Sequence, residues 1–535
     1  MSSSAGTSPD NDRISGTKPA FERLPMVPIL AVVSAIAVGL ANANGISIGD
    51  DGVGYRAIAD SLLAGDGLGY FLERPVTVWP PLWPALMAFV AKVTPLDTVG
   101  AAILLNCLVA ALIVFAGNRL LRLITSDPTL ILMGTAVLAI GPATVGLGHV
   151  LMTDMAFALV VIVWMTLLIK ATSARSLGLL IGAAAFSWLG FGLRYVGLTL
   201  IAIGGLWLLL QHGRPFLERL RDGIIYGVVA CIVPVAWMVR NYSIDETFTG
   251  ERHTSARGLI DNGFDIAATI GRFILPGVLN EQTKPWAAVG ILATGLAVVA
   301  VWRILADNNG SSRPTEVITA GWRQLGTPVG LVGTWTVLYL VYMLYVRTTT
   351  ALNQLDLRLL FPAYFTTIFM GIVIAERGPR IGVEIRRARV IVGTWMAANV
   401  VAGLIAMVAF GMGHPFFTGD YQSDTFREVR ANPVLAAIPP GCETYSNLPN
   451  ALYPRLNPRG WSPQRTALES IDPVDDLERI EKRSKDHETC LVWIDEQPVY
   501  GHLWTLDQLK DRLTLTKLGQ NDSVSVFRVT PGSTN

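Results

Sequence analysis

The chain has 535 residues, of which 51% are hydrophobic and 16% are charged, and its mean hydropathy is +0.45. A soluble protein of this length carries nearer a quarter charged residues, so the composition excludes an ordinary soluble globular protein. The formal net charge of +1 gives no information about partners, and we expect no nucleic acid among them.

Residues 1–23 are polar and lack an apolar core, so we expect a disordered cytoplasmic tail and no cleavable signal peptide. Apolar blocks of about 17–25 residues follow, the length that crosses a hydrocarbon core of roughly 30 Å. The pattern predicts an all-α polytopic membrane protein with about eleven transmembrane helices. The predicted spans are Leu24–Ala43, Val99–Leu121, Thr129–Val150, Met155–Lys170, Leu177–Leu193, Val196–Leu210, Ile224–Arg240, Trp286–Leu305, Pro328–Val346, Leu359–Ala375 and Val390–Phe410.

The apolar segment Pro80–Val93 is short for a span and opens with prolines, so it predicts a helix that lies in the outer membrane interface or dips into it. With the N terminus in the cytoplasm, the arginine-rich segment 377–389 then faces the cytoplasm, as short inner loops do. Under this topology residues 44–98, 241–285 and everything after Gly411 face the outside. We therefore expect an integral plasma (inner) membrane protein with its functional residues at the outer face.

Beyond the spans, residues 412–535 contain short β-type runs and a charged helical stretch, which predict a small extracytoplasmic α/β domain. Residues 24–411 are the predicted transmembrane catalytic domain. Cys442 and Cys490 lie in the outer domain, where they either pair in an oxidising compartment or remain two separate buried thiols. Cys107 and Cys231 lie in apolar spans and are interpreted as packing residues.

Two adjacent carboxylates, Asp50 and Asp51, lie where the chain leaves the first span, within the stretch "ISIGDDGVGYRAIADSLLAGDG". Carboxylates facing lipid are costly, so they are expected to face water or a partner. Asp51 either acts as a general base or caps the following interfacial helix, which is expected to end at Gly65. The glycine-rich "GDGLGY" is interpreted as a turn, because no strand precedes it to make a nucleotide site.

A third carboxylate, Asp154, begins a later span at its outer end and is predicted to form a second acidic wall of the same cavity. His149 lies nearby, but a histidine and a lone aspartate are too few ligands to predict a metal site. Basic residues also gather at the outer ends of spans, where each either pairs with a carboxylate such as Asp356 or holds a phosphate. The candidates for phosphate binding are Arg74, Arg194 and Arg358.

Aromatic side chains accompany these charged residues. Trp79 and Trp83 stand beside prolines, a position that suits membrane-interface anchoring or a wall on which a sugar stacks. The residues expected to line the substrate are Tyr55, Trp79, Trp83, His149, Tyr195 and Asp356.

The order "GDDGVGYRAIADSLLAGDG", "WPPLWPALMA", "MTDMAFAL", "LRYVGL" and "LDLRLLFP" resembles the GT-C superfamily of polytopic glycosyltransferases, over roughly 24–210 and the Arg358 region. The most similar branches are the glycosyltransferase family 39/83-like group, with aminoarabinose transferases and protein O-mannosyltransferases, and the arabinofuranosyl- and mannosyltransferases of actinobacterial envelopes. The resemblance implies a GT-C fold with a soluble outer domain. The aminoarabinose branch has a lysine where this chain has Trp79, which argues against that activity and leaves Arg74 as the replacement.

What the resemblance implies chemically is inverting transfer of a sugar from a polyprenyl-phosphate donor to a glycan, lipid or protein acceptor in the envelope. Asp50 or Asp51 matches the catalytic carboxylate, and Asp51 is preferred. Asp154 matches the second carboxylate and Arg358 a late basic residue. No cofactor is expected, although the adjacent aspartates leave a divalent cation compatible with the site. The rival hypothesis is a lipid-linked glycan transporter or flippase, which should show paired repeats and charged helices near the midplane.

Overall fold

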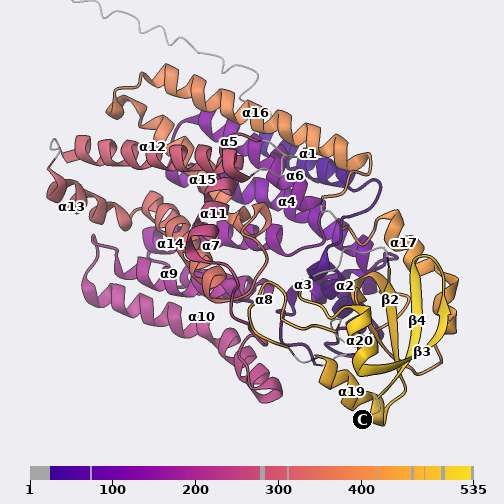
Figure 1. Cartoon of the computed structure of the whole chain (residues 1–535). Coiled ribbons are helices and arrows are strands. Elements are labelled where there is room, and N and C mark those ends of the chain that lie inside the picture. Colours follow the sequence, from indigo (N-terminus) through magenta and orange to yellow (C-terminus); the bar gives the residue numbers. More distant parts are fainter. Residues whose placement is uncertain are drawn as a thin grey trace, which may run out of the picture.

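The computed structural model describes residues 25–72, 75–276, 283–309, 313–416, 419–458, 463–474, 476–495 and 501–531. The predicted tail, 1–23, and the candidate phosphate ligand Arg74 therefore lie outside the described residues. The described chain forms one helical body with a small sheet at one end (Figure 1).

Every predicted span coincides with one or two helices, and the protein is an integral membrane protein. Within the described residues, eight helical segments are long and apolar enough to cross a membrane, and four apolar helices are shorter. The helices of the predicted spans are α1 (Met26–Ala41), α4 (Thr98–Ile124), α5 (Pro128–Ile140) with α6 (Pro142–Gly148), α7 (Asp154–Ala174), α8 (Leu177–Leu193), α9 (Leu198–Leu209), α10 (Phe216–Asp245), α12 (Thr283–Asn309), α14 (Pro328–Thr349), α15 (Leu357–Glu376) and α16 (Ile385–Gly411).

One predicted span is interrupted. Thr129–Val150 divides into α5 and α6 because Gly141 adopts an extended conformation and Pro142 cannot continue the hydrogen-bond ladder. The close approach of α16 adds to this, since a Cβ on Gly403 would lie 1.5 Å from the carbonyl oxygen of Ile140. The interface prediction for Pro80–Val93 corresponds to the separate short helix α3 (Leu82–Val93).

Two amphipathic helices were not among the predicted elements: α11 (Leu259–Ile274), within the segment 241–285 that was predicted to be an outer loop, and α13 (Pro314–Leu325). The helices α11 and α12 pack closely through glycines. A Cβ on Gly271 would lie 2.0 Å from the carbonyl oxygen of Trp286, and one on Gly290 would lie 1.8 Å from that of Ala267. Only glycine permits backbones to approach this closely.

The C-terminal part contains a four-stranded sheet in the order β1-β2-β4-β3. Its strands are β1 (Glu443–Ser446), β2 (Thr489–Ile494), β3 (Leu513–Gln520) and β4 (Val524–Pro531), and its helices are α17 (Asp424–Ala431), α18 (Pro449–Leu452), α19 (Asp476–Asp486) and α20 (Leu506–Arg512). Strands β1 and β2 are parallel, whereas the other pairs are antiparallel. Cys442 and Cys490 form a disulfide. Figure 1 places this sheet beside the short helices α2 (Asp50–Ala64) and α3.

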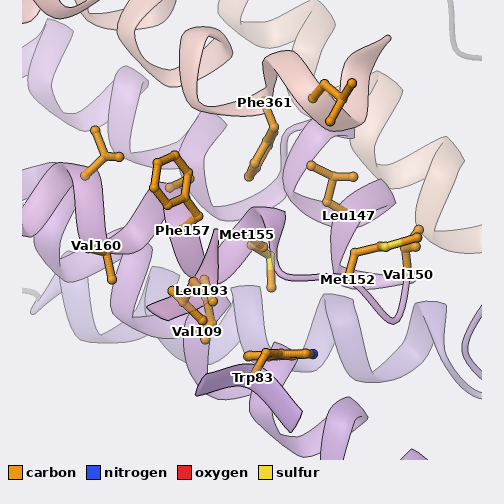
Figure 2. Packing of buried hydrophobic residues seen from close by; sticks show 14 of the residues in the cluster. Trp83, Val109, Leu147, Val150, Met152, Met155, Phe157, Val160, Leu193 and Phe361 are labelled. Carbon is orange, nitrogen blue, oxygen red and sulfur yellow. The ribbon is translucent and has the colours of Figure 1, made fainter. Parts of the chain in front are cut away.

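The hydrophobic core lies directly against the start of α7. Met152, Met155 and Phe157 are buried on either side of Asp154, and Phe361 of α15 belongs to the same core cluster (Figure 2). Trp83 is also part of this cluster and only 1% exposed. The expectation that Trp83 faces the membrane interface or a sugar is therefore wrong, because neighbouring apolar side chains cover its ring.

Candidate functional site

The helix that carries the paired aspartates begins with them. Its N-cap residue is Gly49, and no side chain caps it, so the interpretation of Asp51 as the cap is wrong. Asp50 and Asp51 instead occupy the first turn, where the helix dipole favours negative charge. The helix ends as predicted at Gly65, whose φ of 86° lies in the left-handed region that glycine adopts without steric cost.

The glycines that follow the aspartates let α2 approach its neighbours. A Cβ on Gly52 would lie 2.9 Å from the carbonyl oxygen of Leu151, and one on Gly54 would lie 2.9 Å from the Trp79 ring. These two glycines therefore allow α2 to pack closely against the segment before Asp154 and against Trp79.

Backbone pairing joins the two acidic segments. Ser47 donates its N–H to the His149 carbonyl at 2.8 Å and accepts from the Leu151 N–H at 3.0 Å. Asn106 of α4 donates to the carbonyl groups of Gly148 and Val150, both at 3.1 Å. These bonds fix the stretch before Asp50 beside the stretch before Asp154, although about a hundred residues separate them in sequence.

Each of the two principal carboxylates pairs with an arginine. Arg358 donates to Asp51 at 2.9 Å, and Arg194 donates to Asp154 at 2.5 Å. The Asp51 side chain is 32% exposed, whereas that of Asp154 is only 2% exposed. The charges of Arg358 and Asp51 both act on Asp154, so the two ion pairs form one electrostatic cluster. The site thus presents one accessible carboxylate backed by one buried carboxylate.

Asp356 has a different role from the one considered for it. It caps α15 by accepting from the Leu359 N–H at 3.3 Å, and it does not pair with Arg358. Its charge nevertheless reaches Asp154 and Arg358, so it belongs to the surroundings of the cluster.

Asp50 faces away from these arginines. Its Oδ1 accepts hydrogen bonds from the Tyr421 hydroxyl at 2.6 Å and from the Asn450 amide at 2.8 Å. Both partners lie in the C-terminal part of the chain. The two adjacent aspartates are therefore separated by their partners, and Asp51 is the one that remains accessible at the ion-pair cluster.

Three aromatic side chains stand beside the cluster. Tyr55 is buried on α2, and its burial, together with the charge of Asp51, raises the pKa of its hydroxyl well above the ordinary value. The half-buried Trp79 contacts Tyr55 edge-on, with ring centroids 6.1 Å apart. Tyr195 is also half-buried and donates its hydroxyl to the carbonyl of Thr77 at 2.5 Å, which holds the segment before Trp79.

His149 lies outside this group. It is 4% exposed and stacks on Phe410, with ring centroids 4.6 Å apart. The expectation that His149 lines the substrate is wrong, because its ring packs inside the protein.

Arg252 lies in the segment 241–285, which the sequence predicts to be an outer loop, and it was not among the predicted site residues. Its guanidinium lies 5.9 Å from the centre of the Tyr195 ring and interacts electrostatically with Asp51. It is exposed, and among the described residues no carboxylate lies within ion-pair distance of it. The sequence marks Arg252 only as an arginine in a predicted long outer loop. Many surface arginines have such a position, so it did not identify Arg252 as a site residue.

No three histidine, cysteine, aspartate or glutamate side chains in the described ranges gather closely enough to hold a metal ion. The polar chemistry of the cluster consists of carboxylates facing guanidinium groups. Such a site can remove a proton and can neutralise an anion.

No protein-family model matches the chain, and no curated protein matches it in sequence. Its structure is similar to that of ArnT from Cupriavidus metallidurans bound to undecaprenyl phosphate, with a TM-score of 0.55 and 13% identity over 96% of this chain and 98% of that chain. The apo state of the same protein gives a TM-score of 0.50 and 15% identity, over 95% of this chain and 98% of that chain. The oligosaccharyltransferase of Archaeoglobus fulgidus, tethered with an acceptor peptide, gives a TM-score of 0.50 and 11% identity. This match covers 82% of this chain and 63% of that chain. The chain therefore has the GT-C membrane fold.

Proposed function

We propose that this protein is an inverting glycosyltransferase that moves a sugar from a polyprenyl-phosphate donor to a glycan, lipid or protein acceptor of the cell envelope. The observation that carries the proposal is the accessible carboxylate of Asp51, held by Arg358 within one cluster with Asp154, Arg194 and the exposed Arg252. The arrangement combines a base with cations for a phosphate leaving group.

In the proposed reaction an acceptor hydroxyl attacks the anomeric carbon of the sugar from the face opposite the phosphate. The new carbon–oxygen bond forms as the bond to the phosphate oxygen breaks, and the phosphate leaves with the electron pair. Asp51 takes the hydroxyl proton. Arg252 and Arg358 offset the charge that grows on the phosphate, because a guanidinium binds phosphate oxygens through two parallel hydrogen bonds.

The buried pair of Asp154 and Arg194 has a supporting role in this scheme. An ion pair that is largely removed from water is rigid and fixes the local field. The half-buried Trp79 and Tyr195 are the proposed contacts of the sugar ring, and the buried Tyr55 supports Trp79 from behind. Arg74 remains a proposed phosphate ligand from the sequence.

The structural similarity supports a lipid-phosphate donor, since the ArnT structure contains undecaprenyl phosphate and covers nearly the whole chain. The arginine-rich inner loops support a cytoplasmic N terminus. The disulfide between Cys442 and Cys490 supports an extracytoplasmic position for 412–535, because disulfides persist in oxidising compartments. We therefore assign the reaction to the outer face of the membrane, with 24–411 as the catalytic domain.

The test is sugar transfer by the purified full-length chain in nanodiscs, with synthetic polyprenyl-phosphate mannose and polyprenyl-phosphate arabinofuranose as the two donors and an envelope glycan as acceptor. Asp51→Asn should abolish transfer of whichever sugar is used, whereas Asp507→Asn, at a carboxylate 91% exposed on α20, should leave it unchanged. Wild-type activity in Asp51→Asn would overturn the mechanism. Translocation of the lipid-linked sugar across proteoliposomes without transfer would favour a flippase instead.

A further inference from the structure

The C-terminal part of the chain holds helix α2 at both ends. At its start, Asn450 and Tyr421 donate to Asp50, and the Tyr70 hydroxyl donates to the Asn450 oxygen at 2.8 Å. Near its end, the Tyr453 hydroxyl donates to Asp60. Because successive residues of a helix lie about 100° apart around its axis, the grip on Asp50 leaves Asp51 directed to another side.

Backbone contacts reinforce the same joint. The Ile48 N–H donates to Asp420 at 3.0 Å, and the Tyr421 N–H donates to the Ile48 carbonyl at 3.0 Å. The stretch immediately before α2 is therefore tied to the stretch immediately before α17. The position of Asp51 depends on residues that lie well beyond the last transmembrane helix.

A second set of contacts ties the C-terminal part to the segment before α11. Glu469 accepts a hydrogen bond at 2.9 Å from Arg347, a residue of α14 that is fully buried. Arg347 also donates to Ser255 at 2.9 Å, and the Ala256 N–H donates to the Glu469 carbonyl at 3.0 Å. A buried guanidinium requires an anionic partner, so Glu469 fixes the loop around 253–257. That loop carries Arg252.

We propose that Asn450 and Glu469 are positioning residues that hold Asp51 and Arg252 at their working separation across the site. Asn450 acts through Asp50, and Glu469 acts through Arg347 and Ser255. Neither touches the reacting atoms. The inference rests on the proposed function, and it makes the C-terminal domain part of the catalytic geometry. A displacement of about 1 Å at a reacting group can cost roughly 100-fold in rate, so such anchors matter to catalysis.

The first experiment alters the joint at Asp50. Asn450→Asp sets a carboxylate against Asp50 and should lower kcat about 100-fold while the donor KM changes little. The reciprocal double variant Asp50→Asn with Asn450→Asp restores an amide–carboxylate hydrogen bond, now donated from position 50 and accepted at position 450. It should recover most of the lost rate. Asp424→Asn, at a carboxylate 90% exposed on α17, is the matched control and should behave as wild type.

The second experiment alters the other joint. Glu469→Gln removes the anion that faces Arg347 and loosens the loop of Arg252, a proposed phosphate ligand. The donor KM should rise about tenfold, as expected when one charge-assisted contact weakens, with a smaller change in kcat. A merely structural role would instead lower the amount of folded protein and leave both kinetic constants of the folded fraction unchanged.

Hydrogen–deuterium exchange of 50–64 in the full chain gives a readout that does not require activity. Exchange should be faster in Asn450→Asp than in wild type, and the reciprocal double variant should return it toward the wild-type rate. If wild type transfers no sugar, the proposed function fails, and the exchange rates still decide whether Asn450 positions α2. Unchanged exchange and unchanged kcat in Asn450→Asp would overturn the positioning role, as would a double variant with native exchange and no recovery of rate.

Discussion

Asp50 and Asp51 show how two identical neighbours acquire different roles from their partners alone. Asp50 accepts from neutral donors of the C-terminal part, whereas Asp51 pairs with the Arg358 guanidinium and keeps 32% of its side chain exposed. A base must be reached by the hydroxyl that it deprotonates, so exposure favours Asp51. Asp154 is only 2% exposed, so its burial favours a structural role as the partner of Arg194.

The difference in burial between Asp51 and Asp154 predicts that substituting them changes the free energy of unfolding by different amounts. Asp154→Asn leaves Arg194 without its anion in a buried setting and should lower the free energy of unfolding by about 3 kcal/mol, in addition to reducing transfer. Asp51→Asn removes the more exposed carboxylate, and the buried Arg358 still feels the charges of Asp154 and Asp356, so this substitution should cost less, about 1 kcal/mol, while abolishing transfer. Thermal unfolding of both variants in the same detergent checks this. Equal destabilisation by the two substitutions would contradict the division of roles.

At the level of residues, the sequence predicted which charges meet but not how they pair. Asp51, Asp154, Arg194 and Arg358 were all expected at the outer ends of spans, because charges there avoid lipid. The choice of Asp51 over Asp356 as the partner of Arg358 depends on the direction in which α15 presents its first turn, which tertiary packing decides. Sequence position also placed His149 beside Asp154, although its side chain turns into the core.

At the level of elements, α2 works as a short rigid carrier whose position is set by glycine. Gly52 lets the helix rest against the carbonyl of Leu151, so the distance between α2 and the segment before α7 is fixed by backbone contact. A carbonyl oxygen on a buried, hydrogen-bonded segment cannot move aside as a flexible side chain can.

Gly52→Ala should therefore shift α2 away from Leu151 and lower transfer activity at least about tenfold, because the helix carries Asp51. The matched control is Gly227→Ala on α10, where a Cβ meets no atom within 4 Å and activity should be unchanged. Transfer rates of the two variants, normalised to folded protein from size-exclusion chromatography, provide the measurement. Full activity in Gly52→Ala would show that the close contact has no bearing on the site.

The spans were predictable as elements because long apolar blocks have few alternatives in a membrane. Helix α11 was not, because Asn262 and Asp265 interrupt its apolar pattern and resemble loop residues. In the structure these two side chains are buried, while Ile260 and Phe264 are exposed. The first half of the helix is polar toward the protein and apolar outward, the opposite of the pattern used to recognise a surface helix, whereas Phe273 in its second half is buried.

At the level of the whole molecule, the disulfide separates two candidate arrangements of the cysteines. With Cys442 paired to Cys490, the denatured protein should show two reactive thiols, Cys107 and Cys231, without reductant and four with it. Thiol titration of unalkylated protein, denatured directly after purification from membranes with and without reductant, makes the count. Four thiols without reductant would contradict the pairing and remove its support for an extracytoplasmic domain.

The hydrogen bonds from Tyr421 and Asn450 to Asp50 span 371 and 400 positions in the chain. A ribosome adding 5–20 residues per second needs on the order of 20 to 80 seconds to make the later partners after Asp50 has emerged. During that interval α2 has already been synthesised, but the residues that donate hydrogen bonds to its Asp50 have not. The hydrogen bonds that hold the start of α2 therefore form late in synthesis, and a nascent chain halted before Asn450 would lack the anchor at Asp50.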